Sequence, residues 1–231
     1  MKLPDLAFAC FVYGRLSEND TSYQRFLAAT TYSPDLRVDA HRKYLLTWLN
    51  EWGCRQFAKN YHNLASKNIL SWYNQFSDRL PSEETNLWQL DEDQLIKIGA
   101  AFESLSDRTA SYRTRGAKRY RVSVGSTGAA KILFAIRPKA LVPWDEFIRH
   151  SLNFDKPRQS YPDFLRMAKQ ELTTLETSCR MCGFQLADLP VQVSRPNSTV
   201  PKLIDEYYWV TLSEGLAPPD PEMLRRWASW A

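Results

Sequence analysis

The sequence predicts a mainly α-helical fold, and three observations support this prediction. Apolar residues recur at helical spacing along most of the chain, as in Leu45, Trp48, Leu49 and Trp52. Alternating runs that would indicate strands are short and occur at 119–124 and 191–193. Of the 231 residues, 44% are hydrophobic and 24% are charged, which supports a folded core and argues against a disordered chain.

Each helix is justified by its own start and stop signals. Asp39 is expected to cap a helix that Gly53 ends, and Asp91 to cap another that runs to Leu105. The polar, basic stretch 106–126 and the stretch 188–200, which holds two prolines, are expected to be loops. Apolar spacing and flanking prolines place the other helices at 64–76, 127–136, a short one from Asp145, 160–179, 201–212 and 221–230.

These elements suggest how the chain is organised. We expect residues 1–231 to form one functional unit with two helical lobes, 1–107 and 108–231, and a central cleft between them. The tryptophans at helical spacing are assigned to the core, because an aromatic in such a stripe usually packs rather than binds. These are Trp48, Trp52 and Trp72.

Several protein classes are excluded by composition and motifs. The eight glycines form no dinucleotide-binding or P-loop motif, and the longest apolar run, 6–13, is too short to cross a bilayer. Asp5 stands where a signal peptide would be cationic, so we expect a cytoplasmic protein with no membrane partner. Among the four cysteines only Cys179 and Cys182 are close, so free thiols, no metal and no cofactor are expected.

The segment 108–121 is strongly basic. Its cations are Arg108, Arg113, Arg115, Lys118, Arg119 and Arg121, and no acidic residue lies among them. Tyr112 and Tyr120 are interleaved with these cations. Arginine and lysine neutralise phosphates and tyrosine stacks on bases or sugars, so the segment is either a nucleic-acid contact or a solvated loop.

A glycine-containing turn follows the basic segment. It comprises Gly125, Ser126, Thr127 and Gly128 and leads into the apolar helix that carries Lys131. The first amide groups of a helix have no partner within the helix and lie at the positive end of its dipole, where a phosphate binds. Such a contact positions DNA without reading its sequence.

Asp145 begins the next helix, directly after Val142-Pro143-Trp144. In the simpler interpretation it is an N-cap, which stabilises a helix by about 1 kcal/mol. In the second interpretation its carboxylate, held near the phosphate-binding turn, stabilises a developing sugar cation or activates a water.

Together, the turn, the helix after it and the Val142-Pro143-Trp144-Asp145 segment with Arg149 resemble the helix-hairpin-helix superfamily of DNA base-excision glycosylases. The resemblance covers about 25 residues, Gly125 to Arg149. It implies a helix-hairpin-helix-like DNA-binding element. The position where bifunctional members carry a nucleophilic lysine holds Gly128 or Ala129 here, which implies a monofunctional enzyme.

The resemblance also implies a substrate and a set of site residues. The substrate is duplex DNA with a flipped, damaged or modified base, including glucosylated hydroxymethylcytosine in phage DNA, and the enzyme is expected to be monomeric. The candidate catalytic residues are Asp145, as a carboxylate, and Lys131. Lys131 is the nearest lysine and either pairs with Asp145 or lies on the exposed helix face, which we favour. Trp144, His41 and Arg42 are candidates for the base pocket, although Trp144 also suits the core and His41 also suits a surface or capping role.

Three other functions stay open. The same basic segment and turn suit a DNA-binding module without chemistry, in which Asp145 is only a cap. A housekeeping repair glycosylase would use the same residues as a defence enzyme. A helical protein whose basic segment meets an acidic protein would not bind DNA at low salt.

Overall fold

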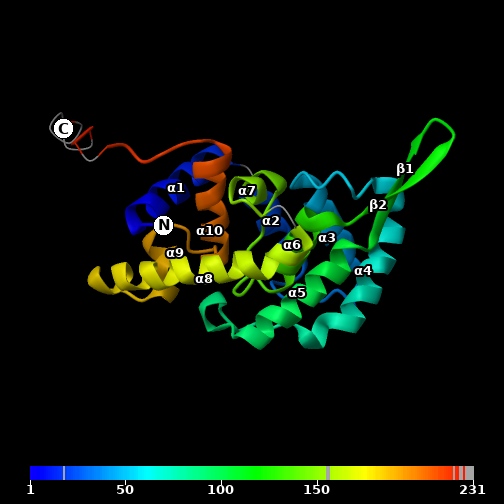
Figure 1. Cartoon of the computed structure of the whole chain (residues 1–231), viewed down its shortest axis with the longest axis horizontal. Helices are drawn as coiled ribbons and strands as arrows, with labels where there is room; N and C mark the ends of the chain where they lie inside the picture. Colours follow the sequence, from blue (N-terminus) through cyan, green and yellow to red (C-terminus); the bar gives the residue numbers. More distant parts are fainter. Residues whose placement is uncertain (18, 155–156, 221, 224–225, 227–231) are drawn as a thin grey trace.

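The computed structural model describes residues 1–17, 19–154, 157–220, 222, 223 and 226. The fold is mainly helical, as the sequence predicts, with one two-stranded sheet. The helix expected at 221–230 lies largely outside the described residues. Figure 1 shows an elongated molecule with a β-hairpin projecting at one end and both the N-terminal and the last described helices at the other.

The first half of the chain is helical and includes two helices before residue 39 that were not predicted. Its helices are α1 (Leu3–Leu16), α2 (Asn19–Ala29), α3 (Asp39–Glu51), α4 (His62–Phe76) and α5 (Glu92–Ser106). Asp39, expected as an N-cap, is instead the first residue of its helix, with Val38 at the N-cap position. Gly53 ends α3 with φ +77°, a conformation that favours glycine. Asp91 caps α5, because its Oδ1 accepts a hydrogen bond from the Gln94 amide at 2.7 Å.

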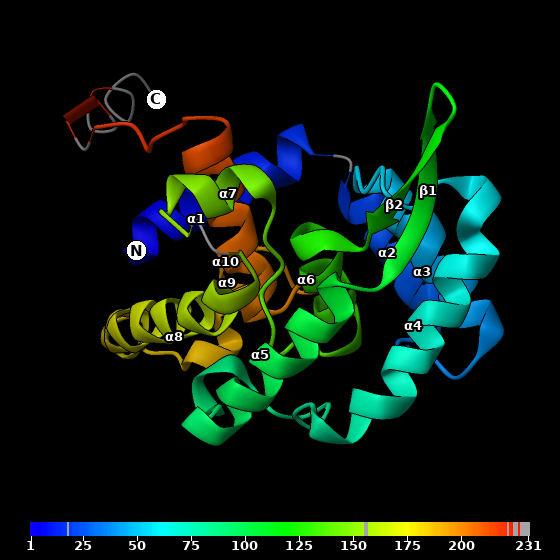
Figure 2. The ribbon, with the colours of Figure 1, turned by 45° about the vertical axis from the view of Figure 1, so that its right-hand side comes forward.

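The stretch 106–126, expected to be a loop, is instead a β-hairpin of β1 (Thr109–Arg115) and β2 (Lys118–Ser123). The prediction was wrong because the strands contain few apolar residues, so their alternation gives a weak signal. The register pairs Arg115 with Lys118 across a two-residue turn, whose first residue, Gly116, has φ +61°. Figure 2 shows the hairpin extending away from the helices.

The second half of the chain is again helical. It comprises α6 (Gly125–Ile136), α7 (Glu146–Ser151), α8 (Pro157–Met181), α9 (Leu189–Gln192) and α10 (Val200–Tyr208), which continues into a π-helical turn, Trp209–Ser213. The stretch 188–200, expected to be a loop, contains the short helix Leu189–Gln192, which has Pro190 at its second position. Pro162 lies in α8 directly against Gly99 of α5, where a β-carbon would come within 2.6 Å of the proline ring.

One continuous hydrophobic core joins the helices. It includes Trp48 and Trp72, which are buried as predicted, together with residues from α1 through α10. α1 packs against α10, although the two helices come from opposite ends of the chain. The first helix therefore packs on elements of the second expected lobe, 108–231.

Candidate nucleic-acid interface and active site

The turn before α6 forms a hollow on the surface. Gly125 has φ +69°, so the backbone here adopts a conformation that favours glycine. The turn is held at both ends, because the Val124 amide donates to the Arg108 carbonyl at 2.7 Å and Gln56 Nε2 donates to the Val124 carbonyl at 2.8 Å. A cavity of about 280 Å³ lies beside it, lined by Gln56, Ser123, Val124, Gly125, Ser126, Thr127, Glu146 and Arg149.

This cavity suits an anion. Gly125, Ser126 and Thr127 are half-buried at the first turn of α6, where amide groups have no acceptor within the helix. The helix dipole favours negative charge at the same place, and Arg149 adds a cation to the wall. A phosphate group is therefore a suitable ligand for this hollow.

Gly128, expected to contact DNA, faces the core. It is buried, and a β-carbon there would lie 2.7 Å from Gln56 Nε2 and 3.2 Å from the Phe57 ring. Its function is to let α6 approach the 54–57 segment closely. Gly128 is therefore not among the residues that line the hollow.

Asp145 caps α7, the helix whose residues Glu146 and Arg149 line this hollow. Its Oδ1 accepts a hydrogen bond from the Ile148 amide at 2.8 Å, as the N-cap prediction requires. The side chain is half-buried, and the next residue, Glu146, lines the cavity together with the turn. Oδ2 of Asp145 has no hydrogen bond to any described residue, so one carboxylate oxygen is left for a ligand.

A second carboxylate, Asp205 of α10, lies near Asp145. Burial raises the pKa of Asp205, the positive charges of Lys202 and Lys131 lower it, and the negative charge of Asp145 raises it again. Lys202 Nζ donates to Asp205 Oδ2 at 3.0 Å. The charges of Lys202, Lys131 and Asp145 therefore all act on the Asp205 carboxyl. Sequence reasoning missed Asp205 and Lys202, although Lys-x-x-Asp on a helix is a recognisable ion-pair spacing.

Lys131 is neither exposed nor paired with Asp145. Its Nζ donates to the Trp52 carbonyl at 2.7 Å and lies 5.3 Å from the centre of the Trp52 ring. Lys202 Nζ lies 5.4 Å from the centre of the same ring. Within the described part of the chain Lys131 has no ion pair with Asp145, and its positive charge instead lowers the pKa of Asp205.

Behind Lys202 lies a larger buried ion network. Lys202 is 1% exposed, and its Nζ lies 3.6 Å from Glu206 Oε1 and 4.0 Å from the centre of the Tyr13 ring. Arg195 donates to Glu206 at 2.8 Å and also pairs with Asp20. The network ties α1, α2 and α10 together.

The residues proposed for the base pocket are structural. Trp144 is buried in a cluster with Phe102, Tyr161 and Phe164, which resolves its two interpretations in favour of the core. His41 Nδ1 accepts a hydrogen bond from the Asp35 amide at 3.1 Å, in agreement with the capping alternative. Arg42 is buried and donates to the Leu36 carbonyl at 2.7 Å, to the Arg37 carbonyl at 2.9 Å and to Ser66 at 2.8 Å. The pocket prediction was therefore wrong for Trp144 and Arg42.

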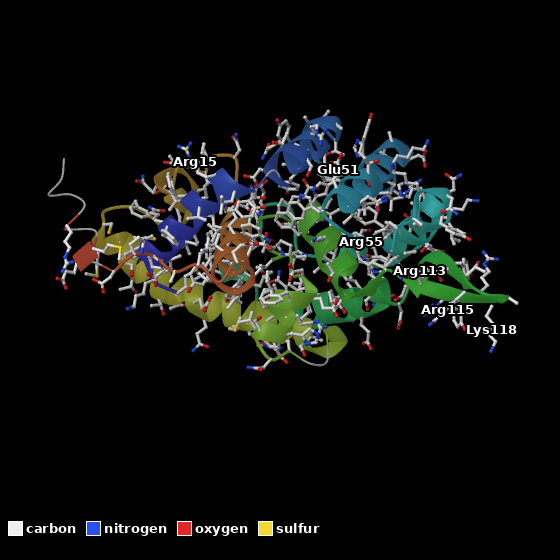
Figure 3. The ribbon with its side chains drawn as sticks, turned by 90° about the horizontal axis from the view of Figure 1, so that it is seen from above. Arg15, Glu51, Arg55, Arg113, Arg115 and Lys118 are labelled. Atoms are coloured by element: carbon white, nitrogen blue, oxygen red, sulfur yellow. The ribbon has the colours of Figure 1, made fainter. Side chains whose placement is uncertain are left out.

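The exposed cations of the hairpin lie beside the hollow. Ser111 of β1 donates to the Gln56 carbonyl at 2.7 Å, which fixes the base of the hairpin to the segment that lines the cavity. Arg113, Arg115, Lys118, Arg119 and Arg121 are all exposed beyond this point. Figure 3 shows Arg113, Arg115 and Lys118 on the projecting hairpin, with Arg55 nearer the helices.

Among the residues that the structure describes, no helix has both the length and the apolar character to cross a membrane, and no three His, Cys, Asp or Glu side chains converge as a metal site would need. Comparison with known proteins gave no match to a family model, to a curated protein or to a solved structure.

Proposed function

We propose that this chain is a monofunctional DNA glycosylase that hydrolyses the N-glycosidic bond of a flipped, damaged or modified base. The observation that carries the proposal is that Asp145 caps α7 directly before Glu146, which lines the anion-suited hollow together with Gly125, Ser126 and Thr127. A phosphate in the hollow would place the adjoining deoxyribose near the free carboxylate oxygen.

The chemistry follows from that placement. As the bond between C1′ and the base breaks, the bonding electron pair leaves with the base and the sugar becomes positively charged. The Asp145 carboxylate stabilises this charge and accepts a proton from the water that attacks C1′, while the departing base takes a proton from solvent. The logic matches that of glycoside hydrolases, which place carboxylates beside a similar cation.

The second carboxylate has no direct role in this proposal. Burial raises the pKa of Asp205, and Lys202 donates to it at 3.0 Å and balances its charge. The charge that acts on the sugar is therefore that of the Asp145 carboxylate.

The test is base release from DNA of phages with modified and with unmodified cytosine, followed by alkali to cut at abasic sites. We expect cleavage by the unaltered chain and its loss in Asp145→Asn, because asparagine keeps the cap and removes the charge. Asp91→Asn is the matched control, since Asp91 caps α5 through the same kind of bond. Glucosylated hydroxymethylcytosine is the modified base that we propose. Unchanged phage sensitivity with a raised mutation rate on gene deletion would favour a repair enzyme.

A DNA-binding module without chemistry is the second candidate. It is favoured by the burial of Trp144 and Arg42, which removes two of the side chains expected to read a base. In that case Asp145 is only a cap, no abasic sites form, and Asp145→Asn leaves DNA binding and biological function intact.

A further inference from the structure

The two faces of the β-hairpin are not equivalent. Because side chains alternate along a strand and paired residues share a face, Arg113 and Arg115 lie with their partners Tyr120 and Lys118 on one face. We call these four residues the free face. Tyr112 and Thr114 lie with Arg121 and Arg119 on the other, which we call the braced face.

The braced face is held by the protein itself. The Arg119 guanidinium lies 3.9 Å from the centre of the Tyr112 ring, and the Tyr112 ring contacts Tyr61 with a centroid distance of 5.9 Å. Arg121 donates to the Asp107 carbonyl at 3.0 Å. These contacts fix the orientation of the hairpin against the loop before α4 and the end of α5.

The free face has no such contacts. Arg113, Arg115 and Lys118 are exposed and form no hydrogen bond or ion pair with any residue that the structure describes, and Tyr120 is 49% exposed. Three unpaired cations within one hairpin repel each other, so a polyanion that neutralises them is a suitable partner. No acidic residue lies between Asp107 and Asp145 to neutralise them locally.

The free face is also the one that adjoins the hollow. Ser111 shares its side of the hairpin with Arg113 and Arg115, and the Ser111 hydroxyl donates to Gln56, which lines the cavity. Arg55, one residue before Gln56, is exposed and likewise unpaired among the described residues. Figure 3 shows Arg55 on the way from the helices to the hairpin.

We infer that the free face is a one-sided ribbon that binds duplex DNA beyond the nucleotide held in the hollow, while the braced face only orients it. This inference rests on the DNA-binding part of the proposed function and not on its chemistry. From Ser123 to Lys118 are five residue steps, so at about 3.4 Å per residue the ribbon reaches about 17 Å, or about five base pairs. Arginines on a ribbon in the major groove contact phosphates or guanine edges.

The test compares two double variants that remove the same charge from the same hairpin. For Arg113→Ala/Arg115→Ala we expect affinity for a long duplex to fall roughly tenfold to a hundredfold at 0.1 M salt and the slope of log K against log salt to shrink by about 1.8. For Arg119→Ala/Arg121→Ala we expect the slope to be unchanged and the melting temperature to fall. Circular dichroism checks that both variants fold.

The length of the DNA gives a second readout. When the duplex ends fewer than about five base pairs beyond the flipped base on the hairpin side, the unaltered chain and Arg113→Ala/Arg115→Ala should bind equally. Equal salt slopes for the two double variants on long DNA would overturn the inference. A difference in affinity between the unaltered chain and Arg113→Ala/Arg115→Ala that persists on short DNA would also overturn it. Base release measured at saturating protein separates the glycosylase proposal from the inference about the free face. A chain that binds DNA through the free face but releases no base refutes the glycosylase proposal and leaves the inference about the free face standing. A chain that binds no DNA at low salt refutes both and points to an acidic protein.

Discussion

Replacing Lys202 by methionine tests the buried ion network through stability. The ammonium group of Lys202 lies 3.0 Å from Asp205 and 3.6 Å from Glu206, and both carboxylates depend on it for positive charge. Methionine fills similar space without the charge. Removing one partner of a buried ion pair costs about 3–5 kcal/mol, because the remaining charges stay buried without compensation. In a chain of this size 1 kcal/mol shifts the melting temperature by about 2–4 °C, so we expect a fall of about 6–20 °C.

The pH dependence of the stability lost in Lys202→Met can also be predicted. Burial raises the pKa of Asp205 and of Glu206, and Lys202 lowers both, so the variant should raise them further. A carboxyl whose pKa is higher in the folded than in the unfolded state binds protons more readily when folded. The folded state therefore gains stability as the pH falls through the raised pKa. The loss in Lys202→Met should be smaller at about pH 5 than at about pH 8.

The assay is urea and thermal unfolding followed by circular dichroism at both pH values. Lys97→Met is the control, because Lys97 is exposed on α5 and its loss should change the free energy of unfolding by less than about 0.5 kcal/mol. A loss below about 1 kcal/mol at both pH values, or one that is independent of pH, would refute the reasoning.

Three further predictions concern packing, capping and thiol reactivity. Gly99→Ala should destabilise the fold by about 1–3 kcal/mol in urea unfolding, since its β-carbon would come within 2.6 Å of the rigid Pro162 ring; an unchanged midpoint would mean that α5 and α8 can separate at no cost. Asp145→Ala should cost about 1 kcal/mol and Asp145→Asn a few tenths, measured by melting temperature, and equal losses would contradict the cap. Iodoacetamide at about pH 8 should alkylate only the exposed Cys182 in the native protein, as read by mass spectrometry. The other three cysteines are buried, which raises their thiol pKa and lowers their thiolate fraction: Cys10, Cys54 and Cys179. Rapid labelling of any of these three would contradict their burial.

Local signals predicted most of the helices. The capping residue Asp91, the terminator Gly53 and the proline after α6 act within a few residues, so the sequence shows them directly. The hairpin was missed because both of its faces are polar beyond its base, which leaves no alternation of apolar and polar residues to detect. Only the run 119–124 indicated a strand, and its partner strand could not be recognised.

The site was predicted in part, because only some of its features depend on residues close together in the sequence. Asp145 is a cap, which depends on the residues directly after it, and the turn at Gly125 leads into a helix as expected. The burial of Trp144 and of Arg42 depends on helices far away in the sequence, so neither could be excluded from the pocket in advance. Asp205 comes near Asp145 only through the packing of α10, which no local pattern encodes.

The pairing of the first helices with α10 has a consequence for biosynthesis. Asp20 and Arg195 form an ion pair across 175 residues, and α1 packs on α10 in the same region. At the usual 5–20 residues per second, a ribosome needs about 10–35 s to add the second partner after the first has been made. During that interval the apolar side of α1 has no cover, which makes the nascent chain a natural client for chaperones. Chains that terminate early, before α10, should be degraded rather than accumulate.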